Sequence, residues 1–173
     1  GVTFNAEVKH TFFSSDYNER FEPFTQLNAE LGVVKTLFNR ISFEAKADIG
    51  ATIGSTPSTN MNYFFGGFGF QSLSNIKSFY GYDFLSTNAN SYLKTMFRID
   101  YRFYKKHHVN FVANYMYSKD AMFQYNDWLE EPIKTGYALG YGFQSIIGPI
   151  EIKQTYSPEI NKHFTWFGVG FWF

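Results

Sequence analysis

The chain has 173 residues, 22% of them aromatic, and equal numbers of acidic and basic side chains give it a formal net charge of zero. It contains no cysteine, which excludes a disulfide framework and a thiolate metal site. Balanced charge argues against a nucleic-acid partner, because such binding depends on clustered lysine and arginine. Mean hydropathy is slightly negative, and no run approaches the roughly 20 apolar residues that a spanning helix requires.

Apolar and polar side chains alternate with a period of two in eight stretches, which predicts eight antiparallel strands. The expected strands cover residues 2–12, 24–37, 41–53, 92–103, 109–118, 137–145, 150–156 and 163–173. In residues 41–53 the charged side chains fall on one face only. An all-β transmembrane barrel, apolar on the outside and polar on the inside, has this pattern.

The last expected strand, residues 163–173, is the most apolar. Phe167, Val169, Phe171 and Phe173 share one face, which suits contact with lipid. The opposite face carries aromatic side chains and glycines where the other strands carry charges. We interpret this stretch as the closing strand of an outer-membrane barrel, since strands exposed to hydrocarbon need an apolar outer row.

The connections alternate between long and short, which is typical of outer-membrane barrels. The short turns at Asn39, residues 105–108 and Gly148, and both chain ends, are expected to be periplasmic. The loops around Asp16, Trp128 and Pro158 are then external, as is the segment 54–90. This last segment is rich in aromatics and shows no regular pattern, and long loops of that kind are usually functional.

The inward face of the expected strands carries charges of both signs, which suit a wet lumen. They are Glu7, Lys9, Glu30, Glu44, Lys46, Asp48, Lys94, Arg98, Asp100, Arg102, Glu151 and Lys153. We expect structural ion pairs rather than transport or catalytic groups. A soluble, lipocalin-like barrel would invert the pattern and place its apolar row inside.

Signatures of catalysis are missing from the sequence. There is no Gly-x-Ser-x-Gly elbow, and the histidines lie at expected strand ends or turns without serine and aspartate partners. His107 and His108 are adjacent, so they point in different directions and make a poor metal site. We therefore expect no enzyme in this chain itself and no cofactor, with a barrel lipase as a remote alternative.

Several motifs resemble one family, the Omp85 superfamily of the bacterial surface antigen type. Residues 140–143 (GYGF), followed by residues 145–152 (SIIGPIEI), resemble its penultimate barrel hairpin. The C-terminal run with Gly168, Phe171 and Phe173 resembles its assembly signal. Residues 63–67 are similar to the F-x-x-G-G stretch that opens its sixth extracellular loop.

The resemblance implies that the segment 54–90 folds back into the lumen. In the family an R-G-[FY] tip contacts an acidic strand residue, and the matching triplet here is Tyr80, Gly81 and Tyr82. Tyrosine stands in place of the arginine, which departs from the family's loop-locking ion pair, and Asp100 is the expected acceptor for a tyrosine hydroxyl. The barrel looks most like that of Bacteroidetes patatin-like phospholipases, whose lipase motif would lie in sequence upstream of this chain.

The resemblance also implies sixteen strands, twice the number found here. A segment as long as 54–90 would overfill an eight-stranded lumen, which has room for little more than side chains. We therefore expect the C-terminal half of a larger barrel, completed by a missing N-terminal half or a second copy. It would contact the lipid bilayer and the outer-membrane assembly machinery, and serve as anchor and conduit for a patatin-like or periplasmic domain. The alternative is a self-contained eight-stranded structural or adhesive protein with the loop outside.

Overall fold

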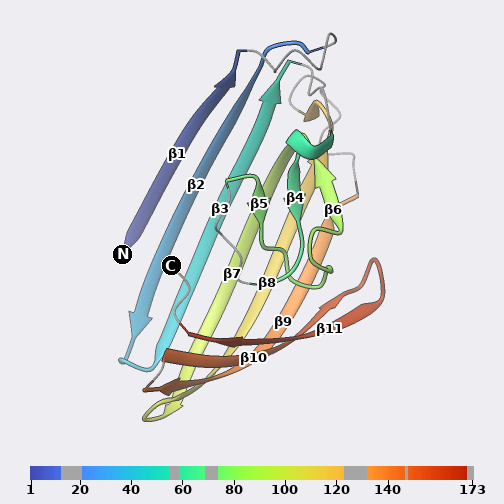
Figure 1. The fold of residues 1–173 in the computed structure, drawn as a ribbon. Helices are drawn as coiled ribbons and strands as arrows, with labels where there is room; N and C mark the ends of the chain where they lie inside the picture. The colour runs from blue at the N-terminus through green and yellow to red at the C-terminus, as the bar shows by residue number, and fades with distance from the viewer. Residues whose placement is uncertain (13–20, 55–58, 69–73, 123–131, 147, 171–173) are drawn as a thin grey trace.

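The computed structural model describes residues 1–12, 21–54, 59–68, 74–122, 132–146 and 148–170. Eight long strands form one antiparallel sheet in which each strand lies beside the next along the chain (Figure 1). They are β1 Val2–Thr11, β2 Phe24–Leu37, β3 Ile41–Ile53, β7 Ser91–Tyr104, β8 His107–Lys119, β9 Lys134–Ser145, β10 Gly148–Ser157 and β11 Lys162–Val169. The sheet is open, because β1 and β11 form its two ends and do not pair with each other in the described residues.

All eight predicted strands are present, and β2 and β3 have the predicted bounds. The turn expected at residues 105–108 is shorter, because β8 begins at His107. β9 begins at Lys134 rather than Tyr137, since its pairing with β8 continues through Gly136, where alternation gives no signal. β11 ends at Val169, whereas residues 171–173 and the loops around Asp16 and Trp128 lie outside the described residues.

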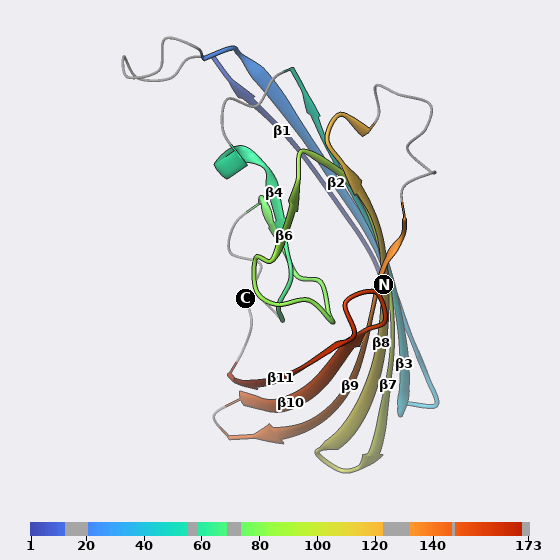
Figure 2. The same ribbon diagram turned by 90° about the vertical axis from the view of Figure 1, so that its right-hand side faces the viewer.

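The two faces of the sheet differ as predicted. Phe97, Leu139 and Phe167 are exposed on the outer face, together with most of the other large apolar side chains of the strands. The charged side chains of β3, β7 and β10 line the inner face, where they pair with one another. Figure 2 shows that this inner face is concave and curves around the chain between β3 and β7.

That chain, described at residues 59–68 and 74–90 and called here the inserted segment, has regular structure, contrary to expectation. A short 3-10 helix, η1 Thr59–Met61, precedes three short strands: β4 Tyr63–Phe65, β5 Ile76–Lys77 and β6 Thr87–Ala89. β4 pairs with β5 in parallel and with β6 in antiparallel fashion, so a small second sheet forms where the sequence shows no periodicity. No helix among the described residues is long and apolar enough to cross a membrane.

The hydrophobic core lies between the inserted segment and the wall of the large sheet. Tyr92 of β7 is fully buried, and its ring centroid lies 4.9 Å from the ring centroids of both Tyr63 and Phe65. Gly50 of β3 makes room for the Tyr92 ring, since a Cβ there would lie 2.2 Å from it. The segment is therefore an integral layer of the fold.

If the outer face contacts hydrocarbon, a charge at its centre should be costly and a charge at a turn should not. Leu139, 64% exposed in the middle of β9, tests the first case; Ile146, 99% exposed in the turn after β9, tests the second. We expect Leu139→Arg to lower the unfolding free energy in lipid vesicles by about 2–4 kcal/mol and Ile146→Arg by about 0–1 kcal/mol. Denaturant titration measures both, and equal losses would contradict a lipid-facing assignment.

Candidate functional site

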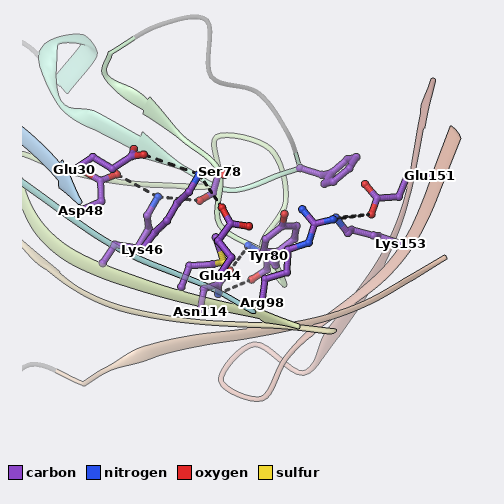
Figure 3. Close-up of a pocket in the computed structure, with 13 residues that line it drawn as sticks. Glu30, Glu44, Lys46, Asp48, Ser78, Tyr80, Arg98, Asn114, Glu151 and Lys153 are labelled. Atoms are coloured by element: carbon purple, nitrogen blue, oxygen red, sulfur yellow. Dashed lines mark hydrogen bonds and ion pairs between the residues drawn. The ribbon is translucent and has the colours of Figure 1, made fainter. Parts of the chain in front are cut away.

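The concave face and the inserted segment together enclose a polar cavity of about 330 Å³. Figure 3 shows charged side chains of both signs converging on it from the wall, with Ser78 and Tyr80 of the inserted segment beside them. The cavity is lined by Glu30, Glu44, Lys46, Asp48, Phe68, Ser78, Tyr80, Lys94, Met96, Arg98, Asn114, Glu151 and Lys153. Four acids and four bases are among them, so the site is balanced in formal charge.

Tyr80, at the tip of the inserted segment, is held through its main chain. Its N–H donates to Asn114 Oδ1 at 2.8 Å, and Asn114 Nδ2 donates to its carbonyl at 3.4 Å. Gly136 of β9 lies beneath this contact, where a Cβ would come within 1.7 Å of the Tyr80 carbonyl oxygen. The segment can approach the wall this closely only because position 136 has no side chain.

The next two residues of the tip, Gly81 and Tyr82, contact β10. Gly81 has φ +86°, and a Cβ there would lie 2.6 Å from the carbonyl oxygen of Tyr156. Both its backbone conformation and its contact therefore require glycine. The Tyr82 hydroxyl is hydrogen-bonded to Ser157, although burial raises the pKa of Tyr82 overall. Tyr80, Gly81 and Tyr82 thus contact three successive strands.

Asp48 of β3 provides the ion-pair anchor of the segment. Its side chain is 2% exposed, and its Oδ2 lies 3.5 Å from Lys77 Nζ of the segment and 3.3 Å from Lys94 Nζ of β7. The Tyr92 hydroxyl donates to Asp48 Oδ1 at 2.6 Å. Lys94 also donates to the Ser78 carbonyl at 3.4 Å, which adds a second link between wall and segment. Removing one partner of such a buried pair leaves an uncompensated charge.

A second cluster surrounds the tip on the β10 side. Glu151 lies 2.9 Å from Lys153 and accepts a hydrogen bond from Asn110 at 2.7 Å. The Lys153 ammonium lies 4.4 Å from the ring centroid of Phe68 and 5.3 Å from that of Tyr80. Burial raises the pKa of Tyr80 to about 12, with Arg98 opposing the shift, so the ring facing Lys153 is neutral at physiological pH. The cation is supplied by the wall and the aromatic face by the segment.

The interactions described for Asp100, the predicted partner of the tip, are with His108 and Arg98. Its Oδ2 lies 2.7 Å from His108 Nδ1 and 3.4 Å from Arg98 Nη2, near the short turns, while the hydrogen bonds of the Tyr80 backbone go to Asn114. The other predicted lumen charges lie at different heights along the strands, some in the middle of the wall and some beside the short turns. Lys46 lies 3.2 Å from Glu44 on the wall, and Arg102 donates to the carbonyl of Asn39 at the rim.

The predicted C-terminal signal is described only in part. Gly168 of β11 is buried opposite Glu151 of β10, and Phe171 and Phe173 lie outside the described residues. The sequence reasoning missed Lys77, Asn114 and Gly136. Gly136 could have been found from the glycines of β9, because repeated glycines on one face of a strand mark a close approach of other atoms.

The fold and this site define a class: a transmembrane β-sheet wall, apolar outside and charged inside, with an inserted loop held against its inner surface. The chain belongs to the OMP85 superfamily, whose family model matches residues 1–173. Membership assigns it to the outer-membrane β-barrel proteins. No curated protein matches the chain.

Gly136→Ala should displace the tip, because its methyl group would meet a backbone oxygen that cannot rotate away. Gly32→Ala is a matched control on the inner face of β2, where the atoms nearest to a Cβ belong to the side chains of Thr3 and Lys46. We expect Gly136→Ala, but not Gly32→Ala, to speed proteolysis within residues 54–90. Equal cleavage rates for both variants would show that the tip does not depend on this contact.

Asp48→Asn should release the segment and destabilise the fold, since Lys77 and Lys94 would lose their shared carboxylate. Breaking a buried ion pair costs about 3–5 kcal/mol. Glu30→Gln is the control, because Glu30 is partly exposed and lies 4.0 Å from Lys46. Hydrogen exchange of the segment's amides should rise sharply for Asp48→Asn and little for Glu30→Gln. Unchanged protection in Asp48→Asn would contradict the anchoring role.

Proposed function

We propose that the chain is the C-terminal half of a sixteen-stranded outer-membrane barrel that anchors, and serves as a conduit for, an attached patatin-like or periplasmic domain. The observation that carries the proposal is the docking of the inserted segment on the concave face. The segment brings its own small sheet, aromatic core and ion pair to that face. An eight-stranded barrel has an interior just wide enough for side chains, so a larger enclosure suits this layer better.

The open sheet supports the same proposal. The outer edges of β1 and β11 carry backbone groups that hydrocarbon cannot satisfy, so both edges need partner strands in a membrane. The missing N-terminal half-barrel would supply them, and a second copy of this chain is the alternative. The other proposed partners are the lipid bilayer and the assembly machinery of the outer membrane.

The conduit role is supported by the chemistry of the lumen. Its cavity is polar and balanced in charge, and most of its charged groups are engaged in ion pairs. We assign no catalysis to these residues, so any hydrolase activity belongs to sequence upstream. The inserted segment is the part whose release would widen the passage, because among the described residues it is the layer that lies over the concave face.

The half-barrel proposal predicts that residues 1–173 expressed alone will not form a heat-resistant monomer in detergent, because two sheet edges lack partners. Co-expression with the upstream sequence of the same gene should restore a heat-resistant species containing both parts. Heat-modified mobility on gels and mass measurement in detergent check this. A heat-resistant monomer of residues 1–173 would instead favour the self-contained eight-stranded protein.

A further inference from the structure

Two neighbouring short turns form a hollow of about 420 Å³ at the end of the sheet opposite the β10–β11 turn. We call it the turn hollow; it is lined by Phe38, Asn39, Arg40, Arg102, Phe103, Tyr104 and Lys105. The two turns are joined by the Arg102 N–H, which donates to the Arg40 carbonyl at 2.8 Å. The Arg102 guanidinium also donates to the carbonyl of Asn39. Hydrogen bonds between the two turns therefore fix the shape of the hollow, whose lining contains three cations, three aromatic rings and no acid.

These cations differ from those in the lumen. Lys46, Lys94, Arg98 and Lys153 each lie within 4.0 Å of a carboxylate. Within the described part of the chain, no carboxylate lies at ion-pair distance from the rim cations, which are Arg40, Arg102 and Lys105. Like charges held together repel one another, so an anion in the hollow would relieve the repulsion.

Phe38 adds a second, independent observation. Phe38 and Asn39 both have positive φ, at 51° and 54°, as a tight hairpin turn of this geometry requires. Glycine or asparagine meets that requirement easily, whereas a bulky side chain there is an outlier. The Phe38 ring is nevertheless 89% exposed, so packing within the chain does not explain it. An aromatic ring projecting beside cations suits the interface between acyl chains and headgroups.

We propose that the turn hollow binds the phosphate of an anionic phospholipid in the periplasmic leaflet. The cations Arg40, Arg102 and Lys105 face the phosphate. The rings of Phe38, Phe103 and Tyr104 cover the glycerol and the first acyl carbons. Charge complementarity selects the headgroup, and the exposed rings select a lipid over a free anion. The inference rests on the proposed function for its orientation, in which these turns are periplasmic.

The test uses the full-length protein that carries this chain, purified in detergent and offered phosphatidylglycerol, phosphatidylcholine or lipopolysaccharide, with inorganic phosphate as a competitor. Native mass spectrometry counts the lipid retained. We expect the wild type to retain phosphatidylglycerol in preference to phosphatidylcholine. In the double variant Arg40→Gln/Lys105→Gln, the amount of phosphatidylglycerol retained should fall about fivefold for each cation removed. Lys162→Gln, at the β10–β11 turn, is the matched control and should retain lipid like the wild type.

Phe38→Gly separates binding from folding. Glycine relieves the positive φ, so the melting temperature should stay the same or rise while phosphatidylglycerol retention falls. A structural role alone would move both in the same direction, which would overturn the assignment of Phe38 to lipid.

Four results would overturn the proposal: equal retention of both lipids, undiminished retention in the double variant, displacement of phosphatidylglycerol by equimolar inorganic phosphate, or preference for lipopolysaccharide. Fractionation of the same proteins tests the proposed function separately. Absence of the wild type from the outer membrane contradicts the proposed function. Normal fractionation without lipid preference contradicts this inference alone.

Discussion

One constraint governs this chain: in hydrocarbon, every backbone N–H and C=O must be paired within the protein. The six inner long strands meet it by pairing on both edges, whereas β1 and β11 each pair on one edge in the described residues. Pairing in turn fixes the faces, because alternate side chains must point outward into lipid or inward. The charges of β3, β7 and β10 therefore lie on the concave side, where acids and bases neutralise one another as close neighbours. The ion pairs of the wall and the docked segment follow from this crowding of charge on one face.

Alternation predicted the strands because each has one face in lipid and one in the lumen. Its failures are local and have physical reasons. Gly136 carries no side chain, so the start of β9 showed no period, although backbone pairing with β8 extends through it. The sequence predicted His107 and His108 to be part of a basic turn. Both belong to β8 instead, and they pair opposite Phe143 and Gly142 of β9. The short strands of the inserted segment, two or three residues each, are below the length at which a period can be read.

The candidate site was harder to predict, because alternation gives the face of a residue but not the depth at which a distant segment will meet it. Asp48 and Asp100 both face inward on neighbouring strands. Asp48 lies opposite Lys94, whereas Asp100 lies opposite Ser42, so the two aspartates are six residues apart along the strands. The inserted segment meets the wall near Asp48, where Lys77 supplies the cation. The ion pair between Asp48 and Lys77 thus holds the segment to the wall. Its location depends on the fold of the segment, which no local pattern encodes.

The contact between Tyr80 and Asn114 uses only main-chain atoms of the segment. The side chain of Tyr80 takes no part in that contact and lines the cavity beside Lys153. The docking of the tip and the chemistry that it presents to the cavity are therefore separable properties, set by different atoms of Tyr80. A substitution at position 80 would therefore change the chemistry of the cavity and leave the main-chain contact with Asn114 in place.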